Sequence, residues 1–257
     1  MKVAILAGGL GTRLSEETIV KPKPMIEIGE QPILWHIMKH YGHFGFHDFV
    51  VALGYKGEYI KRYFMDYYHL STNLTIDLSQ GRVLPHTAER DNWHVDLIDT
   101  GASTNTGGRV KRLKPWLDEG TFMLTYGDGV SDLNLHDLLH FHRAQGRIAT
   151  ITAVRPPARF GGVIFDGDLV AQFTEKSQIN EGWINGGFMV VEPEIFEYLD
   201  NDDTNLESQA LERLANDRQL AAYRHTGFWQ CMDTLRDKRT LDSLWNSGNP
   251  PWKMWES

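Results

Sequence analysis

The chain opens on the stretch VAILAGGLGTRL, residues 3–14, in which an unbroken apolar run leads directly into a glycine-rich loop. A short run that is apolar at every position is typical of a strand covered on both faces, so we expect a buried strand over residues 3–7. Glycines directly after a strand let backbone N–H groups approach an anion closely. The stretch therefore predicts an α/β fold with an anion site after its first strand. A glycine-rich turn without a ligand is the plainer alternative.

Strand and helix patterns alternate along the next residues. Apolar residues at helical spacing predict helices over 32–44 and 59–68, and short apolar runs predict strands over 49–53 and 74–78. Because parallel neighbours need a crossover, this order predicts a mostly parallel, doubly wound sheet flanked by helices. The pattern continues with an expected strand, helix and strand at 121–126, 135–144 and 148–154.

The character of the sequence changes after Arg155. Short strands expected at 163–165, 170–173 and 188–191 are bounded by turn residues, which predicts antiparallel hairpins added to the sheet. Helices are expected again at 206–215 and 235–245. Because no internal repeat and no Pro/Ser-rich linker divides the chain, we expect a single domain over residues 1–257.

Composition excludes several classes of protein. The formal charge of -8, from 26 Lys and Arg against 34 Asp and Glu, offers no general attraction to nucleic acid or anionic lipid. The single cysteine, Cys231, cannot form an intramolecular disulfide and argues against a Cys-based zinc site. No run reaches the roughly 18 apolar residues of a membrane span, and the first apolar run is too short for a signal peptide. We therefore expect a cytoplasmic protein.

The glycine loop differs from two familiar phosphate-binding motifs. A dinucleotide-binding fingerprint needs a third glycine three positions after Gly11, where Leu14 stands, which disfavours a dehydrogenase. A Walker A loop needs Gly-Lys-Ser/Thr, whereas Gly11 is followed by Thr12 and Arg13. Neither motif fits, so the loop indicates a different class of nucleotide or phosphate site.

Positive charge follows the glycine loop closely. Arg13 provides a planar fork for phosphate, and Lys23 stands between two prolines that restrict its backbone. Together these cations would neutralise the leaving part of a nucleoside triphosphate. A solvated basic stretch is the alternative interpretation.

Two aspartates are candidates for holding a metal. Asp128 follows the strand expected at 121–126, at the edge where open α/β sheets bind ligands, although Asp-Gly is also a hairpin-turn signal. Asp233 precedes the last helix, where a helix cap is an equally good explanation. Spacing alone does not pair these residues, because only the fold can bring them together.

Taken together, these motifs resemble those of the sugar-1-phosphate nucleotidyltransferases. The match rests on the glycine loop with Arg13 and Lys23 and extends over nearly the whole chain. The matching segments are residues 8–14, 22–23, 106–109, 126–129, 156–161, 184–188 and 227–238. Ser177 and Cys231 stand where the family pattern has proline.

The resemblance implies a Rossmann-like nucleotidyltransferase fold, a mixed sheet with an added antiparallel sugar-binding portion. It implies CTP and α-D-glucose 1-phosphate as substrates, Mg²⁺ as cofactor, and CDP-glucose and pyrophosphate as products. In the family, CDP-glucose supplies dideoxyhexose synthesis for the bacterial surface polysaccharide, the O-antigen of lipopolysaccharide. A UTP- or dTTP-using enzyme and a non-catalytic nucleotide-sugar-binding regulator are the alternatives. The regulator would be expected to lack some of the charged residues that are present here.

The resemblance also assigns roles to individual residues. Arg13 and Lys23 would be catalytic, and Asp128 and Asp233 would hold the metal. Nucleotide-binding residues would be Leu6, Ala7, Gly8, Gly9, Gly11, Thr12, Arg13, Lys23, Thr106 and Arg109. The sugar phosphate would contact Tyr126, Gly127, Glu175, Lys176, Asn185 and Gly186. Exposed edges of antiparallel strands and the tryptophans near the C-terminus favour a homo-oligomer.

Overall fold

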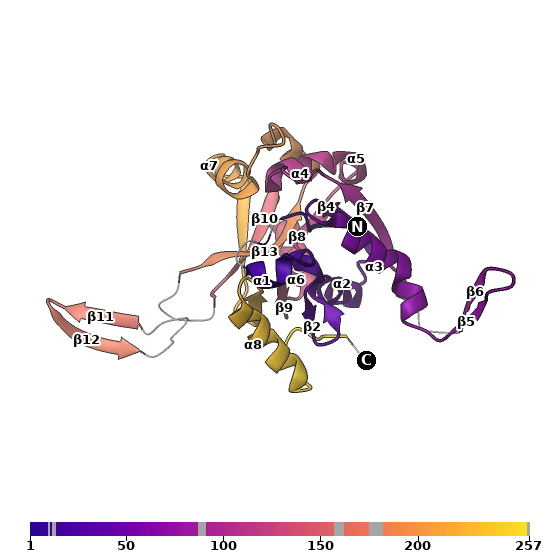
Figure 1. Cartoon of the computed structure of the whole chain (residues 1–257). Helices are drawn as coiled ribbons and strands as arrows, with labels where there is room; N and C mark the ends of the chain where they lie inside the picture. The colour runs from indigo at the N-terminus through magenta and orange to yellow at the C-terminus, as the bar shows by residue number, and fades with distance from the viewer. Residues whose placement is uncertain (10, 12–13, 87–90, 157–161, 175–181, 256–257) are drawn as a thin grey trace.

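A mixed seven-stranded sheet forms the centre of the computed structural model (Figure 1), which describes residues 1–9, 11, 14–86, 91–156, 162–174 and 182–255. The strand order is β14-β10-β13-β8-β1-β4-β7. These strands are β1 (Lys2–Leu6), β4 (Asp48–Leu53), β7 (His94–Asp99), β8 (Phe122–Tyr126), β10 (Ala149–Val154), β13 (Ile184–Val191) and β14 (Leu220–Arg224). β13 runs antiparallel to both of its neighbours, whereas the other pairings are parallel. The expected mostly parallel, mixed sheet is confirmed.

Alternate residues of the central strands face two separate hydrophobic cores. In β1, Val3 and Ile5 belong to one core, and Ala4 and Leu6 belong to the other. This two-sided burial explains why the run is apolar at every position. One core contains residues of α2 (Ile33–His43), α3 (Gly57–Leu70), α6 (Leu135–Gln145) and α8 (Leu235–Asn246).

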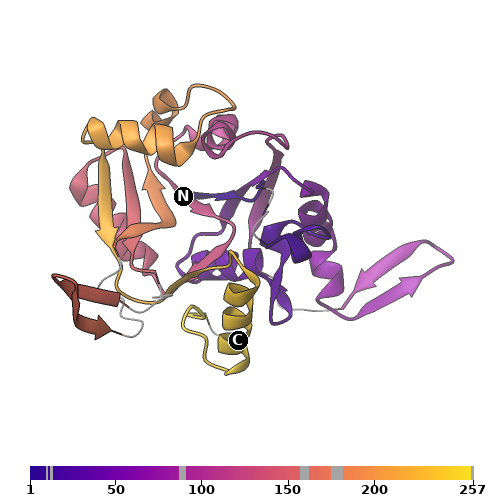
Figure 2. The ribbon, with the colours of Figure 1, turned by 60° about the vertical axis from the view of Figure 1, so that its left-hand side comes forward.

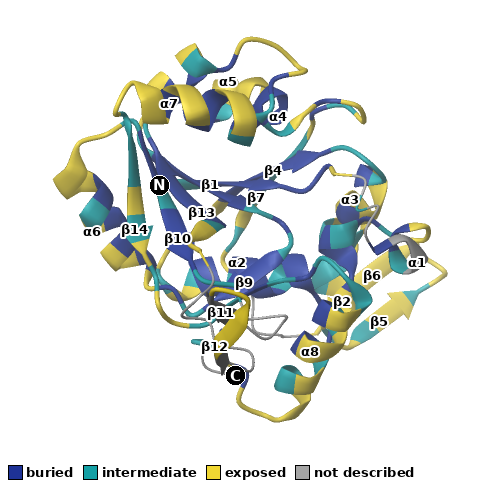
Figure 3. Cartoon of the chain, turned by 90° about the vertical axis from the view of Figure 1, so that its left-hand side faces the viewer, coloured by how far each residue is buried: buried dark blue, intermediate teal, exposed yellow. Residues whose placement is uncertain are grey.

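The second core lies on the other face of the sheet (Figure 3). It contains residues of α4 (Thr106–Arg112), α5 (Lys114–Leu117), the 3₁₀ helix η4 (Pro193–Tyr198), the π-helix η5 (Leu206–Leu211) and α7 (Glu212–Asn216). The helix expected over 206–215 is therefore real, but its first part is a π-helix. Within the described part of the chain, no helix is long and apolar enough to span a membrane.

Two sequence-based expectations about strands were wrong. The stretch at 74–78 does not extend the parallel sheet: β5 (Leu74–Asp77) forms a separate hairpin with β6 (Arg82–Pro85), and β7 pairs with β4 instead. β5 is not packed in the core: two of its four residues are exposed, and Ile76 is 58% exposed, so its apolar residues do not mark a strand of the main sheet. The segment at 188–191 belongs to β13, which lies inside the main sheet between β8 and β10 rather than in an added hairpin.

The hairpin expected from the strands at 163–165 and 170–173 is confirmed as β11 (Gly162–Asp166) paired with β12 (Leu169–Thr174). Figures 1 and 2 show this hairpin and the β5–β6 hairpin projecting on different sides of the molecule. Smaller elements complete the chain: α1 (Ser15–Thr18), η2 (Lys23–Met25), the pair β2 (Glu27–Ile28) and β3 (Gln31–Pro32), and the pair β9 (Gly129–Ser131) and β15 (Trp229–Cys231).

Candidate active site

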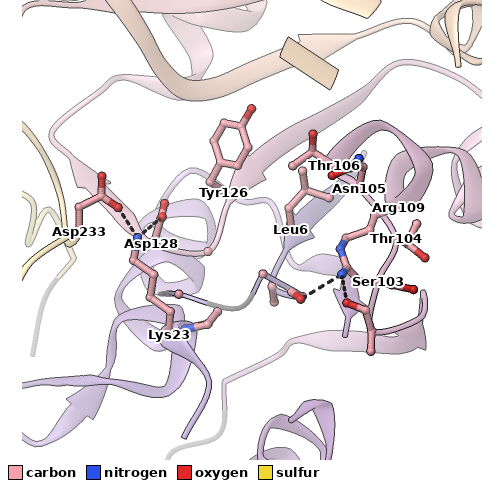
Figure 4. Close-up of a pocket in the computed structure, with 17 residues that line it drawn as sticks. Leu6, Lys23, Ser103, Thr104, Asn105, Thr106, Arg109, Tyr126, Asp128 and Asp233 are labelled. Atoms are coloured by element: carbon pink, nitrogen blue, oxygen red, sulfur yellow. Dashed lines mark hydrogen bonds and ion pairs between the residues drawn. The ribbon is translucent and has the colours of Figure 1, made fainter. Parts of the chain in front are cut away.

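A cavity of about 500 Å³ lies where the strand order changes direction. From β1 the chain proceeds to β4 and β7 on one side and then returns to β8 on the other. Such a switch point, at the carboxyl ends of the strands, is where open α/β sheets bind their ligands. Figure 4 shows the residues around this cavity, which we call the nucleotide pocket after the ligand that the sequence predicts for them. They are Leu6, Ala7, Gly8, Gly9, Gly11, Lys23, Pro24, Ala102, Ser103, Thr104, Asn105, Thr106, Arg109, Tyr126, Gly127, Asp128 and Asp233.

The glycines of the loop after β1 serve different purposes. Gly8 is buried, and a Cβ there would lie 2.3 Å from the Arg109 guanidinium. A Cβ on Gly9, by contrast, would meet no protein atom within 4 Å, although Gly9 lines the pocket. Gly11 adopts a φ of +62°, which favours glycine. Gly8 is therefore required by packing, whereas the Gly9 backbone is open for the close approach of a ligand.

Arg109 holds the walls of the nucleotide pocket together. Its guanidinium donates hydrogen bonds to the carbonyl oxygens of Leu53, Gly8, Gly101 and Ala102, at 2.8 to 3.3 Å. Burial lowers the pKa of Arg109, and the charge of a neighbouring arginine lowers it further. The side chain thus cross-links the glycine loop to the loop before α4, and its role as a nucleotide ligand stays a prediction.

Lys23 lies between the two aspartates that the sequence singled out. Its Nζ is 2.6 Å from Oδ2 of Asp128 and 2.5 Å from Oδ1 of Asp233. Burial lowers the pKa of Lys23, but the two carboxylates outweigh it, so the pKa is raised above its ordinary value. The ammonium group is therefore positively charged and lies between two negatively charged carboxylates.

The fold brings Asp233 to Asp128 through a pair of short strands. β9 begins directly after Asp128 and pairs with β15, and the Met232 N–H donates to the Asp128 carbonyl at 2.8 Å. The cap of α8 is Thr234 rather than Asp233, since the Thr234 side chain accepts from the backbone N–H of Asp237. Asp233 instead lines the pocket, where its carboxylate accepts a hydrogen bond from Nζ of Lys23.

The two aspartates suit a magnesium ion that arrives with a nucleotide. Their oxygens bind one lysine nitrogen at 2.6 and 2.5 Å, so they converge on a single point. Mg²⁺ prefers such oxygen ligands and commonly takes one or two carboxylates, completing its shell with water and substrate phosphates. Among the described residues, no group of three or more His, Cys, Asp or Glu is arranged to hold a metal. The site thus fits a metal shared with substrate rather than one held by the protein alone.

A second cavity of about 320 Å³ adjoins the first, and we call it the sugar pocket after the ligand that the sequence predicts for Asn185 and Gly186 in its wall. Tyr126, Asp128 and Asp233 line both pockets. The other lining residues are Thr125, Gly129, Ile184, Asn185, Gly186, Gly187, Phe188, Glu207, Trp229 and Cys231. The indole of Trp229 donates to the Gly186 carbonyl at 2.7 Å, and the Asn185 side chain accepts from the Gly187 N–H at 2.9 Å. These contacts hold the start of β13 as a polar wall.

The structure brings most of the expected site residues together. Every expected nucleotide-pocket residue among the described ones lines that cavity, as do Tyr126 and Gly127, while Asn185 and Gly186 line the sugar pocket. Thr12, Arg13, Glu175 and Lys176 lie outside the described residues.

Sequence reasoning missed some of the lining residues. Glu207 of the sugar pocket, and Ser103 and Asn105 of the nucleotide pocket, follow no recognisable strand end or motif of their own. Trp229 of the sugar pocket lies in the matching segment 227–238, but the resemblance assigned it no role. Cys231, the single cysteine of the chain, is half-buried and also lines the sugar pocket. Burial raises the pKa of its thiol to about 12, with help from nearby carboxylates.

Comparison with known proteins shows the family of this chain. A sequence model of the nucleotidyl transferase family matches residues 2–246, and the chain belongs to this family. It is 50% identical over 257 residues, all of this chain and of each relative, to the glucose-1-phosphate cytidylyltransferases of Salmonella typhi and Salmonella typhimurium. The solved structure of a UDP-glucose pyrophosphorylase complexed with UDP-glucose has the same fold, with a TM-score of 0.67 and 14% identity over 96% of this chain and 99% of that one.

Proposed function

We propose that this protein transfers the cytidylyl group of CTP to α-D-glucose 1-phosphate, giving CDP-glucose and pyrophosphate. The observation that carries the proposal is the junction of two pockets at one charged cluster, Lys23 with Asp128 and Asp233. A transfer between two phosphates needs such a place, where two substrates meet beside groups that manage negative charge. The relatives that are 50% identical over their full length support CTP and glucose 1-phosphate as the pair.

The reaction needs no general base. A phosphate monoester loses its second proton near pH 6, so glucose 1-phosphate is largely a dianion at pH 7. One of its oxygens forms a bond to the α-phosphorus of CTP as the bond from that phosphorus to the β-phosphate oxygen breaks. The electron pair leaves with pyrophosphate. The protein therefore has to align the two phosphates and neutralise the charge that develops on the leaving group.

The residues of the two pockets, together with others predicted from the sequence, would divide these functions. Gly9 offers open backbone to the triphosphate, and Lys23 provides a positive charge. Asp128 and Asp233 would hold Mg²⁺, which when bound would offset the negative charge of the phosphates. Asn185 and Gly186 would face the sugar phosphate, together with Glu175 and Lys176. Arg13 would contact the phosphates, and Arg13→Ala is expected to lower kcat/KM by on the order of 10².

The choice of nucleotide is tested by pyrophosphate release. CTP, UTP, dTTP, ATP and GTP are each mixed with glucose 1-phosphate and Mg²⁺, with EDTA and sugar-free reactions in parallel. We expect release mainly with CTP and only with metal and sugar present. Release mainly with UTP or dTTP would retain the reaction but overturn the choice of base. If no nucleotide gave pyrophosphate release, the result would favour a protein that binds nucleotide sugars and catalyses no nucleotidyl transfer.

The proposal extends to the setting of the reaction. CDP-glucose from this enzyme would supply dideoxyhexose synthesis for surface polysaccharide, in the cytoplasm and by a single catalytic domain. Self-association is supported by apolar side chains on the β5–β6 hairpin, where Ile76 and Leu78 are 58% and 89% exposed. Light scattering on the purified protein tests this part: a mass of one chain, 29.4 kDa, would contradict it.

A further inference from the structure

The side chain of Tyr126 forms a wall shared by the nucleotide pocket and the sugar pocket. It stands at the end of β8, where a ring can reach across the junction. On one side the ring packs against Gly187, because a Cβ on that glycine would lie 2.5 Å from the ring. On the other side the Tyr126 hydroxyl donates a hydrogen bond to Oε1 of Glu207. The ring is therefore fixed at both ends.

Glu207 joins this ring to the opposite wall of the nucleotide pocket. Its second oxygen, Oε2, accepts a hydrogen bond from the Thr106 hydroxyl at 2.8 Å. That hydroxyl in turn accepts from the backbone N–H of Leu206 at 2.9 Å, so its proton is committed to the carboxylate. Thr106 is the first residue of α4 and lines the nucleotide pocket. One carboxylate thus links both sides of the junction.

The backbone that carries Glu207 is itself held firmly. It belongs to the π-helix η5, a rare conformation that is frequent at functional sites. The preceding loop docks on α4: a Cβ on Gly108 would lie 2.3 Å from the Asp202 carbonyl oxygen, and the Asn105 N–H donates to that oxygen at 2.9 Å. Glu207 is therefore placed by packing that a flexible surface glutamate lacks.

We propose that Glu207 is a positioning residue for the transfer reaction, which holds Tyr126 between the two pockets so that the sugar phosphate and the nucleotide meet in line. The inference rests on the proposed function and adds a residue to it. Glu207 need not contact either substrate for this role. Loss of alignment on the scale of 1 Å costs about 10²-fold in rate, so the effect on turnover is expected to be large.

The test is a double-mutant cycle with Glu207→Ala and Tyr126→Phe, measuring kcat, both KM values and the thermal midpoint. We expect each single variant to lower kcat by about 10- to 100-fold, and the double variant to be no slower than Glu207→Ala. Glu207→Gln should retain more activity, because its amide oxygen still accepts from Tyr126 while its NH₂ group donates to the Thr106 hydroxyl. Glu212→Ala, the same change at an exposed position, should leave kcat unchanged.

Several results would overturn the inference. Additive losses would mean that Glu207 acts independently of Tyr126, and a lower thermal midpoint with unchanged kcat would mean a structural role alone. If Glu207→Ala does not fold, Glu207→Gln and Tyr126→Phe still decide the matter, since wild-type kcat in both contradicts the inference. The proposed function fails separately if the wild type prefers another nucleotide, and the cycle is then measured with that nucleotide. A wild-type protein that releases no pyrophosphate from any nucleotide overturns both the proposed function and the inference about Glu207.

Discussion

The ammonium nitrogen of Lys23 lies 2.5 Å from Oδ1 of Asp233, a residue 210 positions later in the chain. Oδ2 of Asp128 lies 2.6 Å from the same nitrogen. The lysine side chain is only 12% exposed, so its charge is the internal counterion of two carboxylates that point into the pocket. A metal ion bound by these carboxylates would neutralise them in place of Lys23. The ammonium group of Lys23 could then contact the phosphates.

Replacing Lys23 should therefore couple stability to metal. Lys23→Met removes the cation that lies between two neighbouring carboxylates, and removing one partner of a buried ion pair costs about 3–5 kcal/mol. We expect a lower thermal midpoint in EDTA and a marked recovery with Mg²⁺, whereas the wild type should change little. The same variant should lose on the order of 10² or more in kcat/KM.

Lys21→Met is the matched control for this experiment. Lys21 pairs with Glu27 at 2.8 Å, but the glutamate side chain is 54% exposed, and such surface pairs contribute about 0–1 kcal/mol. Its thermal midpoint should be the same with EDTA and with Mg²⁺. If Lys23→Met showed that same indifference to metal, the two aspartates would not be the metal ligands.

Neighbouring glycines in the loop after β1 should respond differently to alanine. In Gly9→Ala the new methyl group meets no protein atom within 4 Å, so the thermal midpoint should stay near the wild-type value. Because the methyl group stands in the nucleotide pocket, KM for the nucleotide should rise several-fold or more. In Gly8→Ala the methyl group would overlap the Arg109 guanidinium, so stability should fall as well.

Thermal denaturation and steady-state kinetics of the two variants check this contrast. The outcome against it is a Gly9→Ala enzyme with unchanged nucleotide KM, which would mean that the phosphates do not approach this backbone.

Gly187→Ala tests how tightly Tyr126 is placed. Gly187 has a φ of +84°, and its added Cβ would lie 2.5 Å from the Tyr126 ring. The variant should move the ring and lower kcat by about tenfold or more. Gly146→Ala is the control, since Gly146 also has a positive φ, +56°, but its Cβ would enter open space. Both variants should lose stability, and kcat should fall only in Gly187→Ala. Equal kcat values in the two variants would show that the position of the ring does not matter.

Much of this architecture could be predicted from the sequence because burial leaves a periodic trace. β1 and β4 are covered on both faces and are therefore apolar from their second residue on. Asp128 could be placed at the site because it comes two residues after the end of a strand, at the carboxyl edge of the sheet. The stretch at 74–78 has strand-like composition but lies in an exposed hairpin, so composition alone misplaced it.

Other parts depend on contacts that leave no local trace. Asp233 reaches the site only because β15 pairs with β9, which spacing does not reveal. Glu207 resembles any acidic residue in the first turn of a helix until η5 is docked on α4. The tryptophans near the C-terminus favour a homo-oligomer when only their composition is considered, whereas Trp252 is fully buried against Phe228 and Trp245 of its own chain.

A buried histidine beside these tryptophans should make stability depend on pH. His36 is fully buried, its Nε2–H donates to the Ile28 carbonyl at 3.0 Å, and its Nδ1 accepts from the Trp252 indole at 3.4 Å. Burial lowers the pKa of His36 to about 4, against the weaker opposite effect of nearby carbonyls. Burial likewise lowers the pKa of His40 to about 3. The contact with the Trp252 indole requires the neutral ring, because Nδ1 can accept a hydrogen bond only when it carries no proton.

The sign of the effect follows from proton uptake. Below the ordinary histidine value of 6.5, the unfolded chain binds protons that the folded chain refuses, so the free energy of unfolding falls as the pH drops. The contribution of His36 is fully present above pH 6.5, decreases down to about pH 4 and is lost below that value. Each such histidine contributes a slope of about 1.4 kcal/mol per pH unit within its window. Urea denaturation of the wild type between pH 7 and 4.5 should show this loss.

His36→Gln separates this contribution from the others, because an amide can still donate to the Ile28 carbonyl and accept from the Trp252 indole without titrating. Near pH 5 the variant should take up about one proton fewer than the wild type on unfolding, while His40 keeps its share of the slope. His69→Gln, the same change on an exposed surface of α3, should leave the slope as it is. A His36→Gln variant with the full wild-type slope would show that His36 is protonated in the folded state at pH 5. Its contact with the Trp252 indole would then have to break without loss of stability.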